Sequence, residues 1–162
     1  MKKSIHEWLK EYSESHQNST NKLIHWFCVP LIFWSIISLL STISNEKLDV
    51  FKLEILNDFS HFGSLVILLG LLFYLRLSFK IFLGMFFFSL LTLIDIFIAN
   101  KIFGQTILTY ISLFIFISAW IGQFIGHKIE KKKPSFLKDI QFLLIGPAWI
   151  ISFIYDYFNI KY

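Results

Sequence analysis

The sequence predicts an all-α, multi-pass membrane bundle of four to five transmembrane or re-entrant helices, on three observations. Hydrophobic residues make up 56% of the 162 positions, charged residues only 16%, and the mean hydropathy is +0.64, outside the range of ordinary soluble domains. The apolar residues form long runs, and a helix needs about 20 residues to cross the hydrocarbon core. These runs exceed the about 10 residues of a membrane β-strand and lack polar alternation, so they predict helices.

We expect one integral-membrane domain over residues 1–162. The segment 1–22 is polar where a signal peptide would carry its apolar core, so we expect it to remain as a cytoplasmic segment. Asn21 is expected to cap the first membrane helix. The four expected spans cover residues 23–43, 62–77, 81–99 and 107–126. A fifth apolar segment, 142–158, is broken by Gly146 and Pro147, so it can be a tilted span, a re-entrant segment or an interfacial helix.

The basic residues favour a cytoplasmic N-terminus. With that orientation only Lys47, Lys52 and Lys101 face the opposite side, while Lys161 stays undecided with the fifth segment. The expected location is a bacterial inner membrane, or the endoplasmic reticulum in a eukaryote. The net charge of +4 does not indicate nucleic-acid binding, because no lysine lies in an aromatic-interleaved patch of the kind that stacks bases.

This topology gathers His6, His16, His25 and His127 at the cytoplasmic face, whereas His61 opens the second span from the opposite side. His25 is expected about one turn inside the first membrane helix, and His16 lies outside it. The two imidazoles can meet only if the intervening loop folds back over the mouth of the helix.

Gln123, His127 and Glu130 follow one another at helical spacing near the end of the fourth span, so they share one face of that helix. Polar groups at such positions face a bundle interior or a watery cavity. Three imidazoles and a carboxylate form a ligand set that suits Fe, Zn, Cu or Ni. Each cluster also has a purely structural interpretation, as interfacial polar residues or as the polar end of a helix.

Two motifs carry a resemblance to a known family. One runs from Ser15 through His16, Asn21 and His25 to Pro30, and the other from Gln123 through His127 and Glu130 to Gly146 and Pro147. Together they resemble a family long catalogued as a domain of unknown function, whose characterised fungal members are endoplasmic-reticulum 2-hydroxy fatty acid dioxygenases of phytosphingosine breakdown.

The resemblance implies an Fe(II)-dependent α-oxidation in which O2 removes the carboxyl carbon of a 2-hydroxy fatty acid, giving an acid one carbon shorter. It implies His16, His25 and His127 as the metal ligands. The role of Glu130 stays open among a ligand, a group that orients His127 and a counter-charge for Lys131–Lys133. The substrate then lies among membrane lipids.

Two other classes of function are weighed against the enzyme. A non-catalytic lipid-binding or scaffold protein would use the polar clusters as headgroup contacts. A transporter would need a charge near the middle of the membrane. The predicted spans offer little beyond Asp95, which lies near the far end of its helix.

Overall fold

The computed structural model describes residues 3–43, 59–135 and 141–162, and these residues form six α-helices and no strand. The prediction of an all-helical protein is confirmed. The helices are α1 (Ile5–Ser13), α2 (Ser19–Ser41), α3 (Phe62–Leu77), α4 (Phe79–Phe103), α5 (Gln105–Glu130) and α6 (Phe142–Tyr157).

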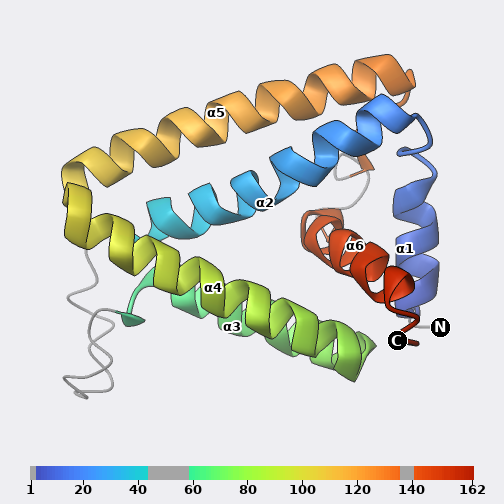
Figure 1. Ribbon diagram of the computed structural model, residues 1–162, viewed down its shortest axis with the longest axis horizontal. Helices are drawn as coiled ribbons and strands as arrows, with labels where there is room; N and C mark the ends of the chain where they lie inside the picture. The colour runs from blue at the N-terminus through green and yellow to red at the C-terminus, as the bar shows by residue number, and fades with distance from the viewer. Residues whose placement is uncertain (1–2, 44–58, 136–140) are drawn as a thin grey trace.

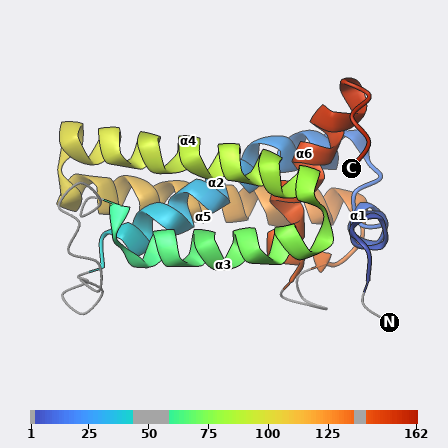
Figure 2. The ribbon, with the colours of Figure 1, turned by 90° about the horizontal axis from the view of Figure 1, so that it is seen from below.

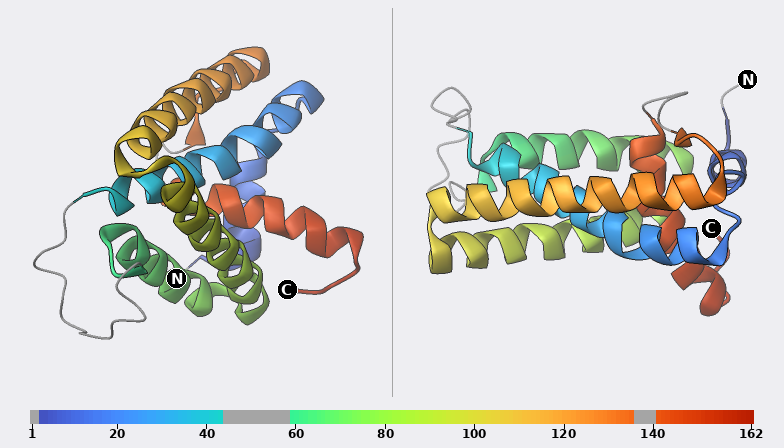
Figure 3. Two further views of the ribbon diagram at one scale, coloured as in Figure 1. Left: turned by 60° about the vertical axis from the view of Figure 1, so that its left-hand side comes forward. Right: turned by 90° about the horizontal axis from the view of Figure 1, so that it is seen from above.

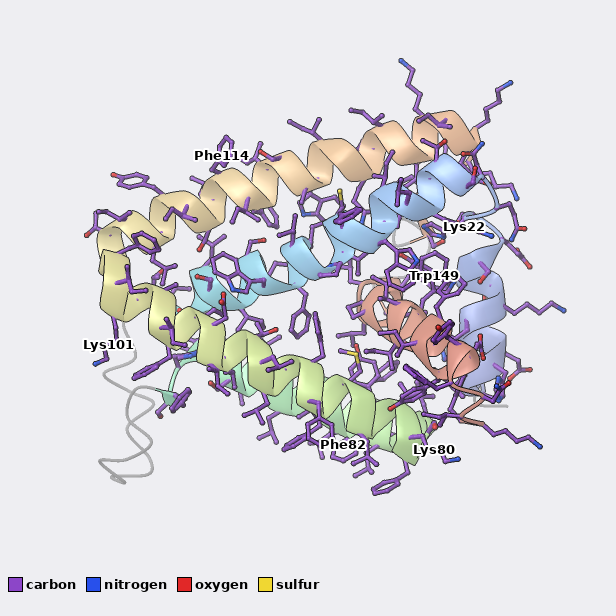
Figure 4. All side chains as sticks on the ribbon, viewed as in Figure 1. Lys22, Lys80, Phe82, Lys101, Phe114 and Trp149 are labelled. Carbon is purple, nitrogen blue, oxygen red and sulfur yellow. The ribbon has the colours of Figure 1, made fainter. Side chains whose placement is uncertain are left out.

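Three of these helices, α2, α4 and α5, are long and apolar enough to cross a membrane, and α3 and α6 are shorter apolar helices of 16 residues each. Large apolar side chains cover the outer surface of the bundle. Phe114 is 73% exposed, and Figure 4 shows it pointing away from the bundle. A soluble monomer rarely exposes apolar surface on this scale, so the helices are those of a membrane protein. A total of four to five spans stays a prediction.

The long helices α2 and α5 lie antiparallel and side by side (Figures 1 and 2). The hydroxyl of Ser112 in α5 donates to that of Ser38 in α2 at 2.7 Å, and both are fully buried. Small residues allow the close approach, since a Cβ at Gly122 would lie 2.7 Å from Cys28 Sγ. The contacts fix the register of the two helices that carry the predicted site.

Helix α1 was not predicted, and it packs with α6 across one end of the bundle (Figure 1). Ser4 caps it in a capping box with Glu7, in which each side chain meets the other residue's backbone N–H. Its apolar face buries Trp8 against Phe142 of α6, with ring centroids 5.1 Å apart. Residues 3–22 are therefore a structured part of the bundle.

Two local predictions are wrong. Asn18, not Asn21, caps α2, because the Asn18 side chain accepts the N–H groups of Thr20 and Asn21 while Asn21 turns into the interior. Helix α6 continues unbroken through Gly146 and Pro147. Gly146 instead makes room for a neighbour, since a Cβ there would lie 3.1 Å from Tyr12 Oη.

Candidate metal centre and adjoining groove

His16, His25 and His127 converge at the end of the bundle closed by α1 and α6. One ligand atom from each lies within 4.8 Å of the others, and all three side chains are buried. The loop between α1 and α2 supplies His16, the second turn of α2 supplies His25, and the last turn of α5 supplies His127. The loop between α1 and α2 thus folds back over the mouth of α2. From the sequence, the imidazoles of His16 and His25 can meet only with this fold.

Backbone carbonyls fix the tautomers of two of these rings. His16 Nδ1 lies 2.6 Å from the carbonyl oxygen of Tyr12, and His25 Nδ1 lies 2.9 Å from that of Asn21. A carbonyl oxygen only accepts, so each Nδ1 carries the proton and each neutral ring keeps a lone pair on Nε2. This is how metal-binding histidines are oriented in proteins.

The ring nitrogens that face one another in this cluster have few partners outside it. His25 Nε2 lies 3.2 Å from His127 Nε2, and within the described residues His16 Nε2 and His127 Nδ1 have no hydrogen-bond partner. Buried polar atoms without partners are costly. A metal ion at the shared position would satisfy the lone pairs, so the three residues fit a metal that accepts imidazole ligands.

The protonation state of His16 suits this role. Burial lowers the pKa of His16 to about 4 and outweighs the hydrogen bond to Tyr12, which acts to raise it. The ring is therefore neutral at pH 7, and neutral imidazole is the form that binds metal. Burial also raises the pKa of the Tyr12 hydroxyl, whose ring stacks on His16 with centroids 4.1 Å apart.

Glu130 lies beside this cluster and is not one of its three members. Its Oε1 accepts the backbone N–H of Gln17 at 2.9 Å. Its Oε2 accepts the backbone N–H of Asn18 at 2.8 Å and the side-chain amide of Asn21 at 3.0 Å. The carboxylate thus ties the end of α5 to the loop that carries His16.

Asn21 is a site residue that the sequence interpretation missed. It is fully buried, its side chain donates to Ser15 O at 3.1 Å as well as to Glu130, and its own carbonyl orients His25. Gly126 makes space for it, because a Cβ at that position would overlap Asn21 Oδ1 and lie 3.4 Å from His25 Cε1. The asparagine and the glycine together set the spacing of α2 and α5 at the cluster.

An apolar groove of about 360 Å³ begins at His127 and follows α2 away from the cluster. Along α2 its lining runs from Val29 to Ile37, which is 8 residues of helix, or about 12 Å. Its rim reaches the outer surface at Val66 and Leu143, which are 40% and 39% exposed. Figure 3 shows α2 running between α5 and α6, the helices that form much of the wall. The apolar lining includes Val29, Ile32, Phe33, Ile36, Ile37 and Trp120.

The remaining residues considered from the sequence lie elsewhere. His6 is exposed in α1 and stacks on Tyr162, with ring centroids 5.3 Å apart. His61 caps α3 close to Gly63, which packs on Ile37, and is thus about 18 Å along α2 from His25. Asp95 in α4 accepts a hydrogen bond from Trp34 Nε1 at 2.6 Å. None of them belongs to the histidine cluster.

Comparison with known proteins gives one match that covers nearly the whole chain. The model of the family described as 2-hydroxy-palmitic acid dioxygenase Mpo1-like matches residues 2–158. The comparisons found no significant match among curated proteins or among solved structures. The family match confirms the resemblance carried by the two histidine motifs, and the chain belongs to the Mpo1-like family.

Proposed function

We propose that the chain is a membrane-bound, Fe(II)-dependent dioxygenase that removes C1 from 2-hydroxy fatty acids to give acids one carbon shorter. The observation that carries the proposal is a set of three buried imidazoles, with unpartnered nitrogen, at the head of an apolar groove. The family description supports the substrate and the use of O2. The groove supports a ligand with a hydrocarbon chain, because its lining offers apolar contacts over about 12 Å along α2.

His16, His25 and His127 would hold the metal. When bound, a ferrous ion would supply open coordination positions for substrate and oxygen and the redox chemistry to activate O2. The carbonyls of Tyr12 and Asn21 hold two of the ligand rings in the tautomer that presents Nε2. The groove holds the acyl chain and keeps water from the reacting carbons.

Glu130 acts as a positioning residue in this proposal. Its hydrogen bonds to Gln17, Asn18 and Asn21 already occupy both carboxylate oxygens. The carboxylate therefore serves the site through the loop that carries His16. Its charge also lies next to Lys131–Lys133, which follow it directly in the chain.

We further propose that the N-terminus and the metal centre lie at the cytoplasmic face. Figure 4 shows Lys22 and Lys80 at the end of the bundle that holds the histidines, and Lys101 at the opposite end. Lys128 and Lys131–Lys133 also belong to the histidine end, at the close of α5. A cytoplasmic excess of lysine sets orientation in multi-pass proteins. Lys47 and Lys52, which the sequence assigned to the far side, lie outside the described residues.

The decisive experiment measures metal and turnover in the same preparation. We expect anaerobically purified protein to contain one iron per chain and to convert 2-hydroxypalmitic acid to the acid one carbon shorter when O2 is admitted. His16→Ala, His25→Ala and His127→Ala should each lose iron and turnover. His61→Ala is the matched control and should keep both.

Full iron occupancy in all three alanine variants would refute the ligand assignment. Wild-type protein that binds the fatty acid but contains no stoichiometric metal and shows no turnover would support a lipid-binding or scaffold function instead.

A further inference from the structure

Two polar side chains line the groove next to His127 and have no role in the proposal above. Tyr12 and Gln123 are each only 6% exposed. Within the described residues, neither the Tyr12 hydroxyl nor the Gln123 amide forms a hydrogen bond, and neither is among the fully enclosed atoms without a partner, so both groups reach the space of the groove. Polar groups in a mainly apolar groove gain most from a ligand that forms hydrogen bonds with them, so the two groups point to such a ligand.

Both groups lie about one helical turn from the imidazoles, in the direction in which the groove extends. On α5, Gln123 precedes His127 by four residues, and neighbouring Gly122 packs against Cys28, which is three residues beyond His25 on α2. The Tyr12 hydroxyl faces Gly146, which also meets Val29, four residues beyond His25. One turn is about 5.4 Å. The two groups therefore occupy the layer between the metal centre and the apolar part of the groove.

A fatty acid that extends from the metal centre into the groove places its first carbons in this layer. Those carbons carry the only polar atoms of a 2-hydroxy fatty acid, the carboxylate and the 2-hydroxyl. A glutamine amide both donates and accepts, so its carbonyl oxygen can accept a hydrogen bond from the 2-hydroxyl group, while a phenol can donate one to a carboxylate oxygen. The apolar residues that follow along α2 offer the acyl chain no polar contact.

We propose that Gln123 recognises the 2-hydroxyl group of the substrate and that Tyr12 binds its carboxylate, so that the pair selects 2-hydroxy acids over unsubstituted fatty acids. The identity of the ligand rests on the proposed function. The placement of the two groups rests on the groove and on the packing of α2, α5 and α6.

The test is a calorimetric titration of the protein as purified in detergent, kept anaerobic so that no turnover occurs. The probes are 2-hydroxypalmitic acid and palmitic acid, and iron content is measured for every variant. Gln123→Leu should weaken binding of 2-hydroxypalmitic acid about tenfold and leave palmitic acid within about twofold, which removes the preference. Tyr12→Phe keeps the ring on His16 and should weaken both acids by about the same factor.

Gln105→Leu is the matched control, because it makes the same change on the same helix at the far end, where the Gln105 amide donates to Thr42 O at 2.7 Å. It should bind both acids like wild type. If Gln123→Leu does not fold, Gln123→Met is titrated in its place. Methionine keeps the length of the side chain without its hydrogen bonds, so the same loss of preference for 2-hydroxypalmitic acid is expected.

Unchanged affinity and preference in the Gln123 variants would overturn the inference, and so would loss of iron from Tyr12→Phe at unchanged affinity for both acids. A wild-type protein without iron or turnover would refute the proposed function separately, because the titration does not depend on turnover.

Discussion

Gly126 lets α2 and α5 approach each other at the histidine cluster, so replacing it with alanine should separate the ligands. The new Cβ would overlap Asn21 Oδ1. Rotating Asn21 away would break its hydrogen bonds to Ser15 and Glu130. Losing the bond to the Ser15 carbonyl would cost about 1 kcal/mol, and losing the bond to the Glu130 carboxylate would cost about 1.5–3 kcal/mol. Moving the helices apart costs about 1–3 kcal/mol. We expect the helices to move, which carries His127 away from His25.

The measurement compares Gly126→Ala with Gly70→Ala. Both substitutions gain about 1 kcal/mol of helix propensity. A Cβ at Gly70, however, meets nothing closer than 3.8 Å, so this control should be neutral or stabilising. Relative to it, Gly126→Ala should lose about 1–3 kcal/mol of stability and about 10- to 100-fold in iron affinity, measured by thermal unfolding in detergent and by chelator competition. Equal iron affinity in the two variants would refute the packing argument.

Three further predictions follow from the same geometry. Glu130→Gln should weaken iron binding about tenfold without abolishing it, because the loop loses charged hydrogen bonds; an iron titration that matches wild type would remove Glu130 from the site. Because the folded pKa of His16 is about 4 and the unfolded value is near 6.5, the unfolded chain binds the extra proton between these values. The free energy of unfolding of the metal-free protein should therefore fall as pH drops through this window, by up to about 1.4 kcal/mol per pH unit, and a flat denaturation profile would contradict the buried neutral ring. In a Cys28→Ser background, an impermeant thiol reagent added outside should label Lys101→Cys but not Lys133→Cys, and the reverse pattern would overturn the proposed orientation.

The convergence of the histidines followed from two features that are visible in the sequence. The lengths of the apolar runs place His16, His25 and His127 at one end of a helical bundle, and the lysines near the runs distinguish that end from the other. Neither feature gives distances. These depend on Asn21 and Gly126, whose close approach joins residues 105 positions apart in the chain.

Helix α1 shows why other parts were missed. Its signals are present, since Ser4 and Glu7 have the spacing of a capping box and Ile5, Trp8 and Tyr12 repeat at helical intervals. So short an amphipathic helix is stable only where its apolar face packs on a partner, and that partner, α6, lies more than 130 residues later.

The cap of α2 was misassigned for a related reason. Asn18 and Asn21 both suit an N-cap, and what separates them is the buried hydrogen bond from Asn21 to Glu130 at the end of another helix. The groove is likewise a product of how the helices pack, so no local pattern indicates it.

The rim of the groove at Val66 and Leu143 opens onto the apolar flank of the bundle rather than toward the water at its end. A molecule that enters there arrives by lateral diffusion within the lipid leaflet. Its encounter rate then depends on its mole fraction in that leaflet. Adding inert lipid at a fixed total amount of ligand dilutes the ligand and slows capture, whereas adding water does not.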